Sequence, residues 1–299
     1  MVLAAVAQLC SKQNVLANLA LCHAGAKLIW LPEASDFIAD AASVPKLAQP
    51  LASSSFVSGI KDAARLGNIW VGVGVHESSE EDPKRCYNTN VLIDPQGNIV
   101  QAYRKVHLFD VNIAGGATIL ESNTTMPGSA ILDPVATPIG SGKEFCSNSA
   151  LHRAADVYFT ATVVGLLTCY DLRFPEANLI LRKRGAQVIT YPSAFTMRTG
   201  AAHWNILLRA RAIESQAYVL ASAQVGFHSP TRQSYGNAMI VDPWGTVLCQ
   251  TPDKLPSNDN NEDAASFAMA DIDLDWLHKI RLEMPLWEQR RPDVYPVLA

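Results

Sequence analysis

Two similar hairpin sequences constrain the fold of this chain more than any other feature. VLIDPQGNIV at 91–100 and MIVDPWGTVL at 239–248 each place Asp-Pro-x-Gly between apolar, strand-like runs. Proline is favoured at the second position of a β-turn and glycine at the fourth, so both segments predict tight hairpins. Their likeness indicates two similar halves. Two such halves suit a two-sheet sandwich with helices outside.

Strand-like and one-sided helical segments alternate along the chain. Helical spacing predicts helices over 56–66, 177–183, 202–215 and 274–284. The polar stretch 252–265 predicts a surface loop rather than a domain boundary, so we expect one α/β domain. Apolar, β-prone runs predict strands over 3–9, 28–31, 69–75, 91–93, 99–104, 163–169, 188–191, 218–223, 239–241, 247–250 and 267–270.

Composition narrows the class of protein. Of the 299 residues 48% are hydrophobic and 17% charged, below the roughly one quarter usual for soluble domains, which predicts extensive burial and an apolar oligomer interface. The net charge of −4 argues against a nucleic-acid partner. Six cysteines without a CxxC pair or metal-binding spacing predict reduced thiols. The N-terminal residues Met-Val-Leu-Ala-Ala lack the basic start of a signal or transit peptide, and no apolar run reaches membrane-spanning length, so we expect a cytoplasmic protein without a membrane partner.

The segment TCYDLRFPE at 168–176 contains the strongest candidate nucleophile. Cys169 follows the β-prone run 163–167, and Phe174-Pro175-Glu176 predicts a break before the next helix. Cys169 would then lie at a strand-to-helix elbow, where free backbone N–H groups bind an oxyanion. The alternative is a buried cysteine that only packs as a small hydrophobe.

Two other predicted strand ends carry charged candidates. In KLIWLPEASDF at 27–37, Glu33 follows an apolar run, and in NIVQAYRKVHLFD at 98–110, Lys105 ends a strand-like stretch. A thiol that attacks a carbonyl needs a base and an oxyanion donor, which these two residue types supply. Alternatively, Glu33 is an acid at a helix N-terminus and Lys105 a solvated strand end.

Together these segments resemble the nitrilase superfamily of carbon–nitrogen hydrolases. LPEAS at 31–35, YRKVHLFD at 103–110 and CYDLRFPE at 169–176 match its glutamate, lysine and cysteine motifs in the family's order. The resemblance implies a four-layer αββα sandwich, which family members commonly pair to extend to αββα-αββα, so we expect a homodimer or higher homo-oligomer. It also implies Glu33 as general base, Lys105 stabilising the tetrahedral intermediate and Cys169 as nucleophile. Glu121, in LESNTTMPG at 120–128, matches a second glutamate that positions substrate and lysine. Its alternative is an ordinary loop acid before a Pro-Gly turn.

The chemistry of this set is consistent with amide hydrolysis. We expect burial to raise the pKa of Glu33 and the neighbouring lysine to lower the pKa of the thiol. The oxyanion would be held by the Lys105 ammonium and the N–H of Tyr170. Glu33 would return its proton to the leaving group and later activate water. No metal or organic cofactor is needed.

Residues near the nucleophile predict how a substrate is held. Arg173 is a candidate clamp for a carboxylate or carbonyl, and its alternative is a structural ion pair with Glu176 or another acid. PSAFTMRTGAAHW at 192–204 follows a predicted strand end and offers Phe195, Arg198, Thr199 and His203. We expect His203 to start a helix or to pack rather than to act in catalysis. The predicted substrate-binding residues are Arg173, Tyr170, Phe195 and Thr199.

The amino-acid sequences of six segments narrow the activity that the resemblance implies. AVAQLCS, LPEASDF, KVHLFDV, ESNTTMPG, PSAFTMRTGAAHW and MPLWEQRRPDVY imply hydrolysis of the small-molecule amide deaminated glutathione to 2-oxoglutarate and cysteinylglycine. The alternatives are ω-amidase activity on α-ketoglutaramate, nitrile hydrolysis, and a catalytically impaired scaffold of the same fold.

Two segments depart from the family pattern. Between 14 and 27 the chain is shorter than the resemblance implies for a first helix. KEFCSNSALHRAADVYFTAT at 143–162 intervenes before the nucleophile strand, which predicts an insertion over about 141–162 in a single domain of residues 1–299. A retained intron and a tolerated surface loop are both open explanations, because long surface loops cost little closure entropy.

Overall fold

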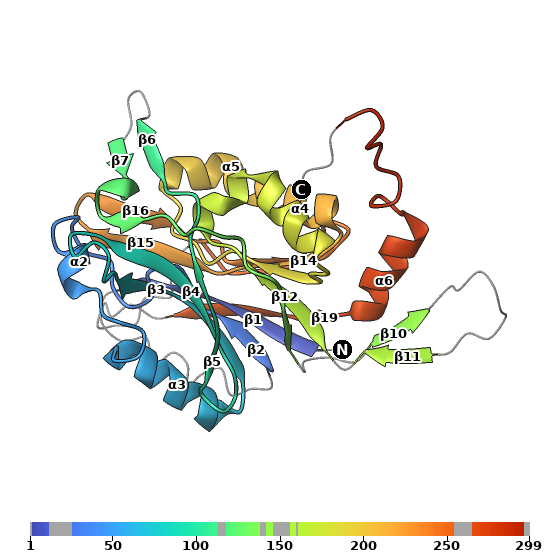
Figure 1. The fold of residues 1–299 in the computed structure, drawn as a ribbon, viewed down its shortest axis with the longest axis horizontal. Coiled ribbons are helices and arrows are strands. Elements are labelled where there is room, and N and C mark those ends of the chain that lie inside the picture. Colours follow the sequence, from blue (N-terminus) through green and yellow to red (C-terminus); the bar gives the residue numbers. More distant parts are fainter. Residues whose placement is uncertain are drawn as a thin grey trace.

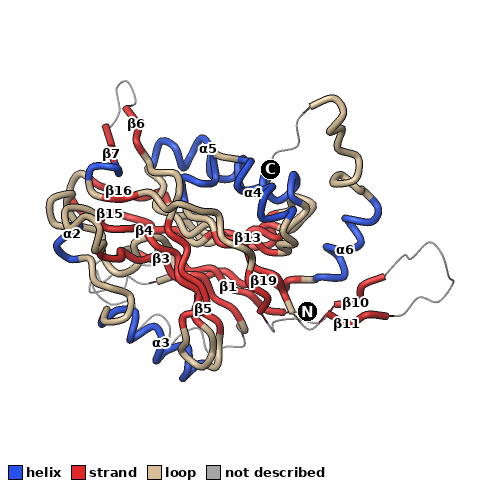
Figure 2. Tube along the Cα trace, viewed as in Figure 1, coloured by secondary structure: helices blue, strands red, loops and turns tan. Residues whose placement is uncertain are grey.

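The structure is a computed structural model that describes residues 2–11, 26–112, 118–137, 142–145, 156–159, 161–253 and 265–295. Two β-sheets lie face to face, and helices cover their outer faces (Figures 1 and 2). Within the described residues, no helix combines the length and the apolar character needed to cross a membrane. The expected αββα sandwich is therefore observed.

The first sheet has nine strands, in the order β16-β15-β1-β2-β3-β4-β5. Strand β19 pairs antiparallel with β1, and β8 pairs parallel with β4. The central strands β1, β2 and β3 are parallel to one another. The bounds are β1 Val2–Leu9, β2 Leu28–Trp30, β3 Trp70–Ser78, β4 Cys86–Ile93, β5 Ile99–Arg104, β8 Thr125–Met126, β15 Ala223–Ser229, β16 Arg232–Tyr235 and β19 Ser266–Ile272.

The second sheet has six strands, in the order β18-β17-β14-β13-β12-β9. Strands β12, β13 and β14 are parallel, and the others pair antiparallel. A separate small hairpin, β6 Asp110–Asn112 with β7 Thr118–Leu120, follows the end of β5. The bounds of the six strands are β9 Val135–Thr137, β12 Thr162–Leu166, β13 Val188–Thr190, β14 Tyr218–Ala221, β17 Met239–Val241 and β18 Val247–Gln250.

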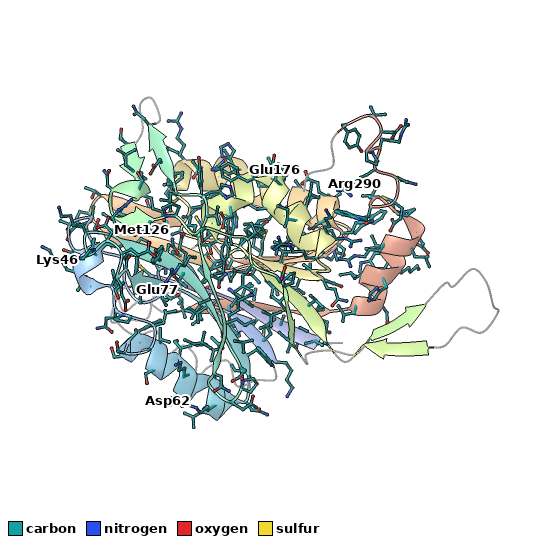
Figure 3. The ribbon with its side chains drawn as sticks, in the orientation of Figure 1. Lys46, Asp62, Glu77, Met126, Glu176 and Arg290 are labelled. Carbon is teal, nitrogen blue, oxygen red and sulfur yellow. The ribbon has the colours of Figure 1, made fainter. Side chains whose placement is uncertain are left out.

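Helices pack on the outer face of each sheet. α3 (Ser55–Gly67) covers the first sheet, whereas α4 (Pro175–Lys183) and α5 (Met197–Ser215) cover the second (Figure 1). Their outer faces carry charge, as Asp62 on α3 and Glu176 on α4 show at opposite surfaces of the molecule (Figure 3). The short α2 (Val44–Leu47) lies beside the first sheet, and α6 (Leu274–Glu283) follows β19.

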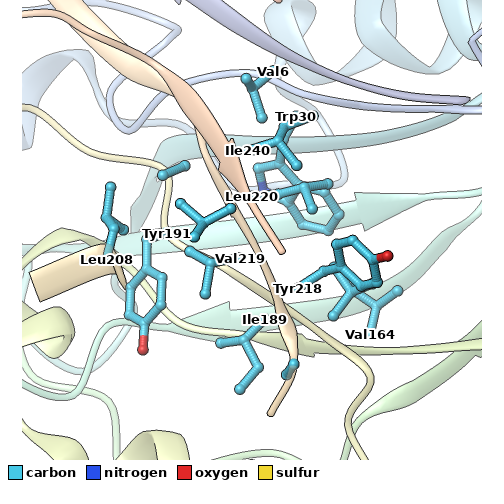
Figure 4. Close-up of a cluster of buried hydrophobic side chains, with 14 of the residues drawn as sticks. Val6, Trp30, Val164, Ile189, Tyr191, Leu208, Tyr218, Val219, Leu220 and Ile240 are labelled. Carbon is cyan, nitrogen blue, oxygen red and sulfur yellow. The ribbon is translucent and has the colours of Figure 1, made fainter. Parts of the chain in front are cut away.

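The main hydrophobic core lies between the two sheets. Val6 and Trp30 of the first sheet face Leu220 and Ile240 of the second, and all four are fully buried (Figure 4). A second cluster lies between the first sheet and α3, where Ile60 is completely buried. Burying one large apolar side chain contributes about 1.5–3 kcal/mol to folding. The packing of the two sheets against each other is therefore the main source of stability.

Both predicted hairpins are confirmed, one in each sheet. In the β4–β5 turn the Gly97 N–H donates to the Asp94 carbonyl at 2.9 Å, and in the β17–β18 turn Gly245 donates to Asp242 at 2.9 Å. Both glycines have positive φ, 78° and 87°, which a side chain would strain. The two turns thus have the same geometry.

Two strand predictions need correction. The strand predicted over 163–169 ends at Leu166, because the chain turns into a short 3₁₀ helix, η3, at Cys169–Arg173. The strand predicted over 218–223 is two strands: β14 ends at Ala221 in the second sheet, and β15 begins at Ala223 in the first. One intervening residue carries the chain between the sheets. The helix predicted over 202–215 also begins earlier, at Met197.

The two departures from the family pattern are only partly described. The shortened segment at 14–27 and the polar stretch at 252–265 lie almost entirely outside the described residues. At 141–162, β10 (Gly142–Phe145) pairs antiparallel with β11 (Asp156–Phe159). This hairpin projects from the end of the molecule opposite α2, β6 and β7 (Figure 1). That the segment is an insertion in a single domain stays a prediction.

Candidate active site

Glu33 follows β2 in a buried turn between the sheets. Only 5% of the residue is exposed, and no helix begins there, so the alternative of a helix N-terminal acid is wrong. The turn lies against β3 at a glycine: a Cβ built on Gly74 would lie 2.5 Å from the Glu33 Cα. The Gln224 side chain also donates to the Glu33 carbonyl at 2.9 Å. These contacts fix the carboxylate in position.

Lys105 follows β5 and is 2% exposed, so the alternative of a solvated strand end is wrong. Its Nζ donates to Glu33 Oε1 at 3.0 Å and to Glu121 Oε2 at 2.8 Å. Glu121 begins the 3₁₀ helix η2 (Glu121–Asn123) and also accepts the Phe109 N–H at 2.7 Å. Glu121 is therefore not an ordinary loop acid, because the buried ammonium lies between it and Glu33.

Asn88, on β4, links the same two carboxylates. Its Nδ2 donates to Glu33 Oε1 at 2.6 Å and to Glu121 Oε1 at 3.1 Å. Sequence reasoning missed this residue. The sequence shows only that Asn88 and Asn90 directly precede the predicted strand 91–93; the structure adds that every residue of β4 is buried. Buried polar side chains need hydrogen-bond partners, so two of them in one buried strand indicate a polar site.

Cys169 comes from the second sheet and faces this cluster. It is the first residue of η3 and has a φ of 44°, a strained left-handed conformation for a cysteine. Its backbone N–H donates to the Pro192 carbonyl at 3.1 Å, and its thiol donates to Glu33. Tyr170 follows in the first turn of η3, where the turn itself gives the N–H no acceptor. The predicted elbow is observed, as a turn rather than a strand end.

Two cavities meet at Cys169. The larger, of about 410 Å³, is lined by Glu33, Asn88, Lys105 and Glu121 among others. The smaller, of about 10 Å³, is lined by Tyr170, Arg173, Phe195 and Thr199, which are the four predicted substrate-binding residues. A thiol, a buried carboxylate and an ammonium at the junction of two cavities can attack a carbonyl and protonate a leaving group.

Comparison with known proteins agrees with this geometry. The family model described as carbon-nitrogen hydrolase matches residues 3–281. The chain belongs to the carbon–nitrogen hydrolase family. It is therefore a hydrolase of carbon–nitrogen bonds, and the resemblance to the nitrilase superfamily is confirmed.

Individual relatives of this carbon–nitrogen hydrolase cover most or all of its length. A probable hydrolase, nit2, of Schizosaccharomyces pombe is 44% identical over 308 aligned residues and is covered completely, as is this chain. The human protein named deaminated glutathione amidase is 42% identical over 275 residues, covering 91% of this chain and 74% of that one. The crystal structure of the Caenorhabditis elegans NitFhit protein matches with a TM-score of 0.81 at 36% identity, covering 99% of this chain and 66% of that one.

The protonation states in this hydrolase site differ from the sequence-based expectation. Burial alone would raise the pKa of Glu33, but the Lys105 ammonium and hydrogen bonds from Cys169, Lys105 and Asn88 lower it. Burial and the nearby Glu33 charge hold the pKa of Cys169 well above its usual value, despite Lys105. The expectation of a raised carboxyl pKa and a lowered thiol pKa is therefore wrong. The resting site holds a carboxylate and a neutral thiol.

Lys105 stays charged in this environment. Burial would lower the pKa of its ammonium, but Glu121 and Glu33 raise it well above its usual value. Across neutral pH, the hydrolase thus holds a permanent buried cation within reach of the nucleophile.

Asp171 supports the nucleophile turn and was also missed. Its carboxylate is completely buried and accepts hydrogen bonds from the Tyr103 hydroxyl at 2.8 Å and the Thr168 N–H at 2.9 Å. It also contacts the His107 ring, Nδ1 to Oδ1, at 2.7 Å. Tyr103 and His107 flank Lys105 in the chain, so Asp171 connects the lysine segment to the cysteine segment. Its place inside the cysteine motif was the only sequence signal.

Arg173 lines the smaller cavity without a carboxylate partner among the described residues. Its Nη1 lies 3.1 Å from His203 Nδ1, and its guanidinium lies 5.5 Å from the ring centroids of Tyr170 and Phe195. The alternative ion pair with Glu176 is not formed. His203 therefore contacts the candidate clamp rather than only packing. In the described part of the chain, no group of three or more His, Cys, Asp or Glu side chains is arranged to hold a metal ion.

Proposed function

We propose that this hydrolase is an amidase that cleaves deaminated glutathione to 2-oxoglutarate and cysteinylglycine through a thioester on Cys169. The observation that carries the chemistry is the buried contact of Glu33 with both Lys105 and the Cys169 thiol. The substrate is supported by relatives of about 40% identity that are named deaminated glutathione amidase.

In the acylation step, Glu33 takes the Sγ proton while the sulfur attacks the amide carbonyl carbon. The neutral thiol and ionised carboxylate of the resting site are the forms that this step requires. Negative charge develops on the carbonyl oxygen, and the Lys105 ammonium and the Tyr170 N–H bind it. The intermediate then collapses, the carbon–nitrogen bond breaks, and protonated Glu33 gives its proton to the departing nitrogen of cysteinylglycine.

In the deacylation step, Glu33 is again a carboxylate and takes a proton from water. The oxygen of that water attacks the thioester carbonyl, and the same two donors bind the second oxyanion. Collapse breaks the carbon–sulfur bond, the sulfur regains a proton from Glu33, and 2-oxoglutarate leaves. The cycle returns every group to its resting state and consumes one water.

Glu121 and Asn88 act in this proposal as positioning residues. Both touch the lysine–carboxylate pair, and neither is needed to carry the transferred proton. With a carboxylate on either side, the Lys105 ammonium has one position from which to meet the oxyanion. Such preorganisation is worth several kcal/mol in enzymes of this kind.

We assign the carboxylate of the α-keto acid end of the substrate to the side of the nucleophile where Arg173 lines the smaller cavity. Arg173 there is a half-buried cation without an acidic partner among the described residues, and Thr199 lines the same cavity. A guanidinium binds carboxylates in a bidentate manner, which suits the terminal carboxylate of a 2-oxoglutaryl group. The aromatic rings of Tyr170 and Phe195 beside it exclude water and strengthen that pairing.

The test is direct quantification of 2-oxoglutarate from purified protein. Deaminated glutathione and α-ketoglutaramate are incubated separately with the parent and with Cys169→Ala. A preference for deaminated glutathione that is lost in Cys169→Ala supports the proposal. A preference for α-ketoglutaramate supports the ω-amidase alternative instead. A folded parent that releases 2-oxoglutarate from neither substrate would support the impaired scaffold.

We further propose a homodimer or higher homo-oligomer in the cytoplasm. The low charged fraction of 17% supports an apolar interface between subunits, and light scattering on the protein as it elutes from a size-exclusion column tests the assembly. The location follows from the cysteine spacing and is tested by cell fractionation with a compartment marker.

A further inference from the structure

Arg232 gives the larger cavity a cation that the proposed mechanism does not use. It begins β16, is solvent-exposed, and lines the same cavity as Glu33, Lys105 and Cys169. Strand β16 lies at the same end of the molecule as α2 and β7, which also contribute to the lining (Figure 1). Arg232 is therefore at the mouth of the cavity whose floor is the reacting cluster.

The other basic side chains of this cavity are already paired. Lys105 contacts two glutamates, and His76 Nδ1 lies 3.0 Å from Asp36 Oδ1. Arg232 has no such partner in the part of the chain that the structure describes; its backbone N–H donates to Ser229 Oγ at 3.1 Å, which leaves the guanidinium unused. An unpaired guanidinium in a cavity beside a nucleophile is suited to bind an anionic group of the substrate.

Each of the two cavities that meet at the nucleophile thus has an arginine without a carboxylate partner among the described residues. Cys169, Phe109 and Ala194 line both cavities, Arg173 belongs to the smaller and Arg232 to the larger. A substrate with its amide at Cys169 and a carboxylate at each end matches this arrangement. The smaller cavity, about 10 Å³, has room for only about one water-sized group, so the bulk of a dipeptide leaving group fits only in the larger cavity of about 410 Å³.

We propose that Arg232 binds the terminal carboxylate of the leaving group and so makes the enzyme select peptide amides over primary amides. The inference rests on the proposed function, in which the leaving group is cysteinylglycine. α-Ketoglutaramate shares the keto acid end but releases ammonia, so it presents nothing to Arg232. The residue would determine specificity without touching the reacting atoms.

The test measures a ratio of kcat/KM values. Parent and Arg232→Gln are assayed with deaminated glutathione, with its C-terminal carboxamide, and with α-ketoglutaramate, by release of 2-oxoglutarate. Because Arg232 is exposed, loss of its ion pair lowers the ratio of the peptide to α-ketoglutaramate about 2- to 5-fold in Arg232→Gln. The parent loses a similar factor when the peptide carboxylate is amidated, and Arg232→Gln loses little more, because the pair is already broken.

Arg65→Gln is the matched control. It removes the same charge from the exposed face of α3, where Arg65 pairs with Asp62, and should keep the parent's ratio. Arg232→Lys retains the charge and should give an intermediate ratio. Melting temperatures confirm that each variant is folded.

The outcomes separate this inference from the proposed function. If the parent cleaves the peptide but Arg232→Gln keeps the parent's ratio, or loses activity equally on all three substrates, the role of Arg232 is refuted and the amidase proposal stands. If the folded parent cleaves none of them, the proposed function fails and the role of Arg232 fails with it.

Discussion

Replacement of Asn88 by alanine tests how the site controls its base. The variant removes the Nδ2 donor that lies 2.6 Å from Glu33 Oε1, at a site where the side chains of Asn88 and Glu33 are both buried. This donor is among the groups that lower the pKa of Glu33. Its removal destabilises the carboxylate relative to the protonated form, so the pKa of Glu33 rises.

The size of the change follows from the bond that is lost. A hydrogen bond to a charged acceptor contributes about 1.5–3 kcal/mol, and one pKa unit corresponds to about 1.4 kcal/mol. We take the lower end, because truncation leaves room for a water molecule to replace part of the interaction. The pKa of Glu33 should therefore rise by about one unit.

The assay is the pH profile of kcat/KM, which reports on the free enzyme. Glu33 acts as a carboxylate, so kcat/KM falls as the pH drops through its pKa. In Asn88→Ala the acid limb of the profile should move to higher pH by about one unit. The substrate is deaminated glutathione, with 2-oxoglutarate as the measured product.

Asn90→Ala is the control. Asn90 is buried on the same strand, but it accepts from the Trp30 ring at 3.2 Å and donates to the Leu167 carbonyl at 3.1 Å rather than to Glu33. It should lower stability and leave the acid limb where it is. If the acid limb of the kcat/KM profile stays in place in Asn88→Ala, or moves equally in Asn88→Ala and Asn90→Ala, the assigned role of Asn88 is refuted.

Three further changes have defined outcomes. Lys105→Met should abolish measurable turnover and lower the free energy of unfolding in urea by about 3–5 kcal/mol, because two buried carboxylates lose their cation; parent-like stability would contradict this. Gly74→Ala should lower kcat at least tenfold, because its Cβ would lie 2.5 Å from the Glu33 Cα and displace that residue; unchanged kcat would show that the turn adapts. Tyr103→Phe should cost about 1–3 kcal/mol in urea unfolding, because Asp171 loses a buried donor at 2.8 Å, and an unchanged midpoint would show that water replaces the hydroxyl.

Local patterns predicted most of the fold because they report on burial. Alternation and apolar runs placed the main strands, and Asp-Pro-x-Gly placed the two turns at 94–97 and 242–245. The same patterns failed at Ser222, where one continuous apolar run supplies two strands in different sheets. Which sheet a strand joins is decided by tertiary packing, which a local pattern does not contain.

The sequence likewise predicted some residues of the candidate site and missed others. Glu33, Lys105 and Cys169 were predicted because each ends an apolar run in a recognisable motif, and Glu121 because its segment matches one. Asn88 and Asp171 were missed because their importance lies in partners distant along the chain. The directions of the pKa shifts at Glu33 and Cys169 were also wrong, since they depend on which of several buried charges is nearest.

Arg232 was missed for a third reason. The hairpin of β15 and β16 was not predicted, because its polar sequence lacks the apolar alternation of a half-buried strand. Its position at the cavity is set by the pairing of β15 with β1 in the first sheet. Only the assembled sheet brings this arginine to the nucleophile.

The division of the site between the two sheets makes turnover a measure of folding. Glu33 and Lys105 follow strands of the first sheet, whereas Cys169 follows a strand of the second. Neither half carries a base and a nucleophile, so a partly folded chain with only one sheet formed has no activity. Hydrolysis should therefore appear during refolding only when the sheets dock. The rate at which hydrolytic activity appears would measure the rate at which the two sheets dock, without any added spectroscopic label.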